Sequence, residues 1–208
     1  TKLKLALSLV EDEEIPPVIY NYIQIIQRAA ERLETIMLSL NKIIQLGDSS
    51  PDVVKRISPA LVFTDVHEEF AETLAQKEAL ITTDFSAVTE LNYIEVYLKS
   101  IFTNLLSNAI KYSSSHRALR LSVSAYRDNG KAAFIFSDNG QGINLDTVGN
   151  KLFQPFTRFS NSSDGSGIGL YLIKNIVERN GGKIDVESRP GEGTTFRFIL
   201  EEYKLPAS

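Results

Sequence analysis

Apolar residues between Val18 and Leu46 recur every seven positions, and a second apolar row lies four positions after the first. The two rows contain Ile19, Ile26, Leu33 and Leu40, and then Ile23, Ala30, Met37 and Ile44. Such a and d positions predict a helix that packs against partner helices, because a helix that only covers its own domain is usually shorter. Packing on its own domain is the alternative. The preceding residues 1–10 fit either a strand or a helix, and we favour a helix.

The pattern changes after residue 46. Gly47-Asp-Ser-Ser-Pro51 is small and polar, which predicts a linker over 47–58. From 59 to 205 helical and strand periods alternate, so we expect a second domain of the α+β class, with a mixed sheet and helices on one face. The expected strands cover about 61–64, 79–84, 118–127, 131–138, 183–188 and 194–202, and the expected helices cover about 65–77, 92–112 and 168–180.

Composition narrows the possible classes of protein. The chain has 208 residues, of which 43% are hydrophobic, and a formal net charge of −4, so no nucleic-acid partner is expected. It has no cysteine, which excludes a disulfide scaffold and a cysteine-based metal site and is compatible with the cytoplasm. No apolar run approaches the ~20 residues of a membrane span, so we expect any membrane anchor to lie outside this sequence.

Two segments rich in glycine are candidate ligand loops. Asp138-Asn-Gly140-Gln-Gly142 ends a strand pattern, and Gly165-Ser-Gly167-Ile-Gly169 directly precedes a helical pattern. Glycine lets a ligand approach the backbone and a helix N-terminus favours phosphate, so we place a nucleotide here. Alone, each segment is weak evidence. The first also fits a surface turn, as the same tripeptide does at Asp128-Asn-Gly130, and the second lacks the Gly-Lys-Ser/Thr of a Walker A loop.

The predicted helix over 92–112 carries an unusual polar face. Asn92 is expected to be its N-cap, with Glu95 as the capping-box partner. The core stripe contains Leu98, Phe102, Leu105 and Ala109, and a second face contains Asn104, Asn108, Lys111 and Tyr112. Asparagine disfavours helix, so two asparagines beside an ammonium group and a ring are hard to explain by packing or by solvation. Amide oxygens and an ammonium group suit a metal ion and phosphate.

Five segments together resemble the N, G1, F, G2 and G3 boxes of sensor histidine kinases of two-component systems, in the order of that family. They are Asn104-Leu-Leu-Ser-Asn-Ala-Ile-Lys-Tyr112, Asp138-Asn-Gly-Gln-Gly142, Phe153-Gln-Pro-Phe-Thr-Arg-Phe159, Gly165-Ser-Gly-Ile-Gly-Leu170 and Gly191-Glu-Gly-Thr-Thr-Phe196. The resemblance covers roughly residues 15 to 202 and extends to the wider GHKL ATPase superfamily. It implies a two-layer α/β sandwich with a Bergerat-type ATP site over 59–205, preceded over 1–46 by part of a helical hairpin for dimerisation and phosphotransfer.

The resemblance also implies a role for each matching residue. Asp138, an acceptor-only carboxylate, would bind the adenine amino group, with Thr194 helping through a water and Tyr112 packing against the ring. Asn104 and Asn108 would ligate Mg²⁺ and, with Lys111, form the catalytic set. The other implied nucleotide contacts are Lys111 and Arg158 at the phosphates, and Gly140, Gly142, Gly165, Gly167, Ile168, Gly169 and Leu170 in the glycine loops. Phe153, Phe156 and Phe159 are expected to anchor a lid in the core.

The implied activity is transfer of the γ-phosphoryl group of Mg-ATP to a histidine, for relay to a response regulator receiver domain. The implied protein is a homodimer through 1–46 and cytoplasmic in this region, compatible with a full-length protein anchored in the inner membrane. No histidine lies in 1–46, and His67 and His116 are expected at the surface. Two alternatives are a nucleotide-binding pseudokinase or docking module, and a mechanical GHKL ATPase, which would need a water-activating Glu where Asn104 stands.

Overall fold

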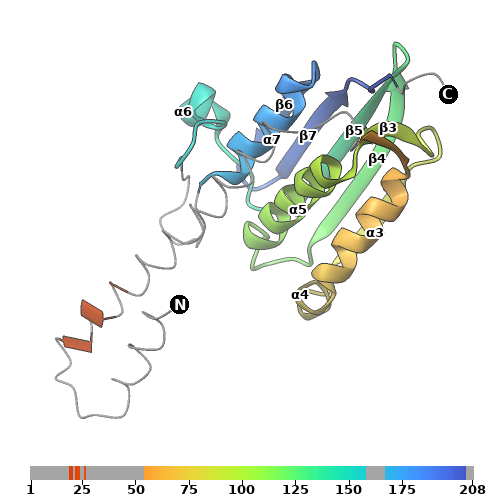
Figure 1. Cartoon of the computed structure of the whole chain (residues 1–208). Coiled ribbons are helices and arrows are strands. Elements are labelled where there is room, and N and C mark those ends of the chain that lie inside the picture. The colour runs from red at the N-terminus through yellow and green to blue at the C-terminus, as the bar shows by residue number, and fades with distance from the viewer. Residues whose placement is uncertain (1–18, 21, 24–25, 27–53, 158–166, 205–208) are drawn as a thin grey trace.

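The computed structural model describes residues 19–20, 22–23, 26, 54–157 and 167–204 (Figure 1). The predicted heptad rows, and with them the helical domain expected over 1–46, lie mostly outside these residues. Ile19 and Ile26 of the first row are helical, and 50% and 52% of their surfaces are exposed. Within the described part of the chain, no helix has the length and apolar character needed to cross a membrane.

A mixed sheet of five strands forms one layer, in the order β2, β4, β5, β7, β6. The strands are β2 (Leu80–Asp84), β4 (Arg120–Asp128), β5 (Lys131–Asp138), β6 (Lys183–Arg189) and β7 (Gly193–Leu200). β2 runs parallel to β4, and the other neighbouring pairs are antiparallel. These strands confirm the predicted ones to within a few residues, because alternation of apolar and polar side chains is a strong local signal.

Helices form the second layer and cover one face of the sheet (Figure 1). α3 (Pro59–Glu69) lies beside α5 (Glu95–Lys111), which lies beside α7 (Gly169–Arg179). The shorter elements are α4 (Ala71–Gln76), α6 (Leu145–Val148) and η2 (Gly149–Lys151). The predicted core stripe of α5 is confirmed, since all four of its residues are at most 2% exposed. The two layers confirm the predicted fold class.

The strand predicted near 61–64 is wrong, because these residues belong to α3. Ser58 caps that helix by accepting a hydrogen bond from Leu61 N at 3.5 Å, and Pro59 stands in its first turn. Serine at the N-cap and proline at the first helical position both favour a helix start. These signals outweigh the strand propensity of the Leu-Val-Phe-Thr run.

The helix predicted from Asn92 begins at Glu95 instead. Asn92 lies in β3 (Leu91–Ile94), which pairs antiparallel with β1 (Val54–Ile57). The side chain of Asn92 therefore does not cap α5, whose N-cap is Ile94. β1 falls within the predicted linker 47–58, so its pairing with β3 could not be deduced from either local pattern.

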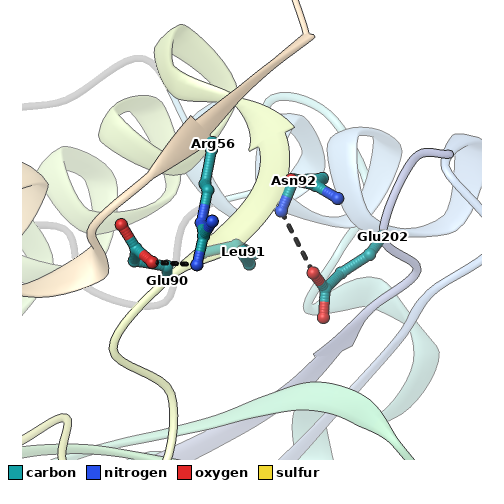
Figure 2. A pocket seen from close by; sticks show the side chains of 5 residues that line it. All are labelled: Arg56, Glu90, Leu91, Asn92 and Glu202. Carbon is teal, nitrogen blue, oxygen red and sulfur yellow. Dashed lines mark hydrogen bonds and ion pairs between the residues drawn. The ribbon is translucent and has the colours of Figure 1, made fainter. Parts of the chain in front are cut away.

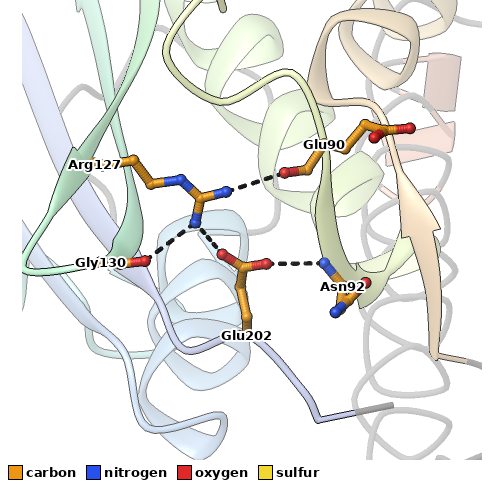
Figure 3. Close-up of polar contacts among 5 residues, drawn as sticks. All are labelled: Glu90, Asn92, Arg127, Gly130 and Glu202. Atoms are coloured by element: carbon orange, nitrogen blue, oxygen red, sulfur yellow. Dashed lines mark hydrogen bonds and ion pairs between the residues drawn. The ribbon is translucent and has the colours of Figure 1, made fainter. Parts of the chain in front are cut away.

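A cluster of polar contacts, here called the clasp, joins the β1–β3 pair to the main sheet and comprises Arg56, Glu90, Asn92, Arg127 and Glu202. Glu90 forms an ion pair with Arg56 at 2.5 Å, and Glu202 accepts a hydrogen bond from Asn92 N at 3.0 Å (Figure 2). Arg127 donates to the Glu202 carboxylate and, at 3.1 Å, to the carbonyl oxygen of Glu90 (Figure 3). Four of these residues, with Leu91, line a cavity of about 310 Å³. The clasp lies at the β4–β5 hairpin end of the sheet.

Phe102 lies at the centre of the core between the two layers. It is fully buried, and its ring contacts those of Phe63, Phe85 and Phe134 at centroid distances of 5.4, 6.3 and 6.0 Å.

Phe102→Ala should lower the free energy of unfolding by about 3 to 5 kcal/mol, because apolar contacts are lost and a cavity is left. Urea denaturation measures this loss. Leu61→Ala, at a residue that is 68% exposed, is the control and should change it by less than about 0.5 kcal/mol. A loss below about 1 kcal/mol in Phe102→Ala would contradict the expectation.

Candidate functional site

The rows of side chains that face the helices along β5 and β7 both end in a polar residue. In β5 the buried Phe134 and Phe136 are followed on the same face by Asp138, since side chains alternate along a strand. In β7, Thr194 precedes two buried phenylalanines on that face. Asp138 and Thr194 are directly paired across the two strands. A carboxylate and a hydroxyl therefore lie together at the edge of the apolar layer.

Asp138 is a partly buried hydrogen-bond acceptor. Its Oδ1 accepts from the backbone N–H of Gly140 at 2.8 Å, and the backbone of Thr194 also donates to the carboxylate. Burial raises the pKa of Asp138, and this effect exceeds the lowering by the two hydrogen bonds and by the positive charge of Arg117. When ionised, the carboxylate has further lone pairs with which to accept a hydrogen bond from an amino group of a ligand.

Ser188 of β6 extends the polar edge to the next strand. Its Oγ lies 2.9 Å from Thr194 Oγ1, accepts a hydrogen bond from Ile143 N at 2.8 Å and donates to Gly193 O at 2.8 Å. Sequence reasoning missed Ser188. A signal existed, because the alternating row of β6 that begins at Ile184 ends in this serine.

The loop 139–142 brings distant segments together. Gln141 N donates to Tyr112 O at 2.9 Å, and Gln141 O accepts from Gly191 N at 2.7 Å. The loop therefore touches the end of α5 on one side and the turn between β6 and β7 on the other. Three of the five segments that carry the family resemblance meet here.

The two Asp-Asn-Gly tripeptides fold differently. Asp128-Asn-Gly130 forms the β4–β5 turn, in which Asn129 and Gly130 have φ of 47° and 84°, so the predicted hairpin is confirmed. After Asp138 the chain continues as a loop instead. There Gly142 has φ of 68°, and a Cβ on it would lie 1.9 Å from Arg189 O. Glycine at 142 is therefore required by close packing as well as by backbone conformation.

The polar face of α5 lies against the N-terminus of α7. Asn104 Nδ2 donates to Ser100 O at 2.7 Å, and a Cβ on Gly169 would lie 2.7 Å from Asn104 Oδ1. Asn108 is half-buried, and its side chain has no hydrogen-bond partner among the described residues. The face thus presents the amide oxygen of Asn104 beside Gly169, the first residue of α7.

Lys111 and Tyr112 complete this face at the C-terminal end of α5. Both are half-buried, and Lys111 Nζ lies 4.9 Å from the ring centre of Tyr112. At the start of α7, Gly167 and Leu170 are half-buried and Ile168 is buried. Arg158 and Gly165, the other predicted nucleotide contacts, lie outside the described residues. Of the predicted residues that the structure describes, Asn104 meets the start of α7, and Tyr112 meets the loop that follows Asp138.

The prediction that three phenylalanines anchor a lid in the core is partly wrong. Phe153 packs against the core, with Lys174 Nζ 5.6 Å from its ring centre. Phe156 is 49% exposed, because its φ of 64° bends the chain and leaves the ring at the surface. Leu152, at 3% exposed, is buried beside Phe153 instead. Phe159 lies outside the described residues.

The two histidines and the possible metal ligands can also be placed. His116 is exposed as predicted, whereas His67 is half-buried in the last turn of α3 because one side of that turn packs on the domain. Within the described ranges, no cluster of three or more His, Asp or Glu side chains could hold a metal ion. Amide oxygens, such as those of Asn104 and Asn108, are among the ligands that Mg²⁺ accepts.

Residues 94–204 match the sequence family described as Histidine kinase-, DNA gyrase B-, and HSP90-like ATPase. The alginate biosynthesis sensor protein KinB of Pseudomonas aeruginosa is 25% identical over 205 residues, which cover 96% of this chain and 34% of KinB. The sensor histidine kinase ZraS of Klebsiella oxytoca is 29% identical over 179 residues, which cover 85% of this chain and 37% of ZraS. The chain thus spans about a third of the length of these relatives.

Solved structures share the fold. Full-length ShkA in complex with AMPPNP superposes with a TM-score of 0.70 at 20% identity, covering 97% of this chain and 42% of ShkA. The histidine kinase ThkA in complex with the response regulator protein TrrA gives a TM-score of 0.65 at 21% identity, covering 96% of this chain and 56% of ThkA. At these identities the likeness concerns the fold alone, and it agrees with the two layers described above.

Gly142 and Gly130 form a matched pair for testing the close packing at the site. Both have positive φ, so alanine at either should cost about 1 to 2 kcal/mol of backbone strain. Only Gly142→Ala adds the clash with Arg189 O, because no atom lies within 4 Å of a Cβ at Gly130. We expect Gly142→Ala to lose about 1 to 3 kcal/mol more stability than Gly130→Ala in urea denaturation. Equal losses would mean that the 139–142 loop moves away freely.

Proposed function

The chain belongs to the Histidine kinase-, DNA gyrase B-, and HSP90-like ATPase family, and from this premise we propose that it is the ATP-binding catalytic region of a sensor histidine kinase. The proposed reaction transfers the γ-phosphoryl group of ATP to a protein histidine. One observation carries the proposal: the partly buried Asp138 lies beside Thr194 where the 139–142 loop meets α5. Few structural roles explain a carboxylate at the end of a buried row.

Adenine recognition would depend on Asp138 and its neighbours. The carboxylate would accept a hydrogen bond from the adenine amino group, and Thr194 would assist through a water. Ser188, which is hydrogen-bonded to Thr194 at 2.9 Å, would fix the orientation of that hydroxyl. Tyr112 would pack against the ring, and Gly140 and Gly142 would let the base approach the backbone.

The phosphates would be held between α5 and α7. Lys111 and Arg158 would supply positive charge, and Gly165, Gly167, Ile168, Gly169 and Leu170 would supply the glycine loop and the N-terminus of α7. Asn104 and Asn108 would hold Mg²⁺ through their amide oxygens, with the remaining ligands from phosphate and water. When bound, the ion would neutralise negative charge on the phosphates. The donor set fits this role, since Asn104 Oδ1 lies at the first residue of α7.

The chemistry would be an in-line displacement. A histidine imidazole nitrogen attacks the γ-phosphorus, the bond from that phosphorus to the bridging oxygen breaks, and ADP leaves with the electron pair. The chain's own contribution is positioning and charge stabilisation. Asn104 cannot accept a proton from water as a carboxylate does, which supports transfer to histidine over rapid hydrolysis.

The partners follow from the same proposal. KinB and ZraS are sensor proteins, and ThkA forms a complex with a response regulator. By analogy, the phosphoryl group would pass to an aspartate of a receiver domain, and dimerisation would use residues 1–46. The region would be cytoplasmic, and the phosphoacceptor histidine would lie elsewhere in the full-length protein or on another chain.

Asp138→Asn tests the adenine assignment. The substitution should weaken ATP binding by roughly a hundredfold, because an amide has one acceptor oxygen in place of two and loses the charge. Isothermal titration calorimetry measures the affinity. Asp128→Asn, in the matching tripeptide of the β4–β5 turn, should leave it unchanged. Equal affinity in wild type and Asp138→Asn would refute the assignment.

Phosphoryl transfer tests the function as a whole. The chain is mixed with labelled ATP, Mg²⁺ and a separate helical hairpin that carries the acceptor histidine of the same full-length protein. We expect acid-labile, base-stable label on the hairpin, and a rate at least about tenfold lower in Asn108→Ala, because an oxygen ligand is lost. Binding of ATP without any transfer would favour a nucleotide-dependent docking module. Rapid hydrolysis that is unchanged in Asn104→Ala would exclude the proposed role of Asn104.

A further inference from the structure

Arg117 contacts both loops that border the Asp138 carboxylate, although the family resemblance gives it no role. It lies in the segment between α5 and β4. Its Nε and Nη2 donate to Asn139 O at 2.8 and 2.6 Å. Nη2 also donates to Gly140 O at 3.0 Å and to Gly191 O at 2.6 Å. One guanidinium thus binds three backbone carbonyl oxygens from two loops that are far apart in the sequence.

We propose that Arg117 is a positioning residue for the nucleotide site, which ties the loop 139–142 to the loop 189–193 and so fixes the carboxylate and hydroxyl that lie between them. The inference rests on the proposed function, in which Asp138 and Thr194 hold adenine. Gly191 N to Gln141 O, at 2.7 Å, is the other hydrogen bond between these loops. Arg117 therefore supplies a large share of the connection between them.

The segment that carries Arg117 is held at both ends. At its start, Ser113 is buried, accepts a hydrogen bond from Lys77 Nζ at 2.8 Å and donates to Ile110 O at 2.8 Å. At its end, Leu119 is 2% exposed and its carbonyl oxygen accepts from Leu80 N at 2.8 Å. Because the backbone on both sides of Arg117 is held in place, its side chain can restrain the 139–142 and 189–193 loops.

The arginine also acts on the charge of the site. Burial raises the pKa of Asp138, whereas hydrogen bonds from Gly140 and Thr194 and the Arg117 charge lower it. Among the described residues, Arg117 is the charged group that acts on this carboxylate. Its removal should raise the pKa further. In the proposed function, the ionised carboxylate accepts a hydrogen bond from the adenine amino group. As the pH is lowered, a variant without Arg117 would therefore lose ATP affinity at a higher pH than wild type does.

One of the contacts is specific to arginine, because two neighbouring nitrogens donate to the same oxygen of Asn139. A guanidinium has five N–H donors in a planar fork, and here it spans three acceptors. Lysine would keep the charge and one donor nitrogen, but it has no second nitrogen beside it, so the paired donation of Nε and Nη2 to Asn139 O would be lost. Arg117→Lys therefore separates the effect of the charge from that of the paired contact with the 139–142 loop. Arg120, which is exposed at the start of β4 and makes no side-chain hydrogen bond or ion pair with the described residues, is the matched control.

The experiment uses the 208-residue chain as wild type, Arg117→Gln, Arg117→Lys and Arg120→Gln. Calorimetry measures ATP affinity across pH, and carbon-13 NMR titration measures the pKa of Asp138 without nucleotide. We expect Arg117→Gln to bind ATP about three- to tenfold more weakly at neutral pH, with a higher Asp138 pKa. Arg117→Lys should keep the pKa near the wild-type value but still bind more weakly. Arg120→Gln should match wild type in both measurements.

Each outcome decides between the claims. If wild type binds ATP, and Arg117→Gln has the same ATP affinity and the same Asp138 pKa, the positioning role is overturned. The proposed function is then unaffected. Wild type that does not bind ATP overturns the proposed function and the inference together. If Arg117→Gln is unfolded by circular dichroism, Arg117→Lys decides, because a wild-type affinity in that variant would show that the guanidinium contact with Asn139 O does not position the site.

Discussion

Placement of a carboxylate at the end of a buried strand row is the constraint on which the site depends. Asp138 continues the row of Phe134 and Phe136 toward the helices, so its charge lies where solvent is partly excluded. The cost of that burial is offset by backbone N–H groups of Gly140 and Thr194 and by the Arg117 charge. The tight loop at 139–142 follows from the same need, because N–H groups can point at the carboxylate only when the backbone turns back on it.

The two ends of the sheet serve different purposes. At the hairpin end of β5, the clasp joins Arg127, Glu202 and Glu90 in a network of charged and backbone groups. At the opposite end the contacts are loops, hydroxyls and glycines around Asp138. Exposed ion pairs contribute little individually, so the clasp is better understood as fixing the position of β1 and β3 than as a source of stability. The end proposed to bind the nucleotide consists of loops, where binding residues are often found.

The repeated Asp-Asn-Gly tripeptide illustrates how register changes the role of one sequence. At 128–130 the aspartate follows Arg127, lies off the buried row and begins a hairpin turn. At 138–140 the aspartate falls on the buried row, and the same three residues begin a loop at the proposed binding site. The difference comes from the side on which each strand ends, since side chains alternate with a period of two.

Local periodicity by itself determined the five main strands, the buried stripe of α5 and the position of Asp138 at the end of a strand. The order and spacing of the five boxes, whose residues are typical of a nucleotide site, also identified the family. Only the tertiary structure decided the pairing of β1 with β3, and with it the loss of Asn92 as a helix cap. It alone revealed the contact of Arg117 with Gly191, 74 residues away. Such contacts depend on how distant segments pack, and periodicity within a single segment carries no information about the segment that will lie beside it.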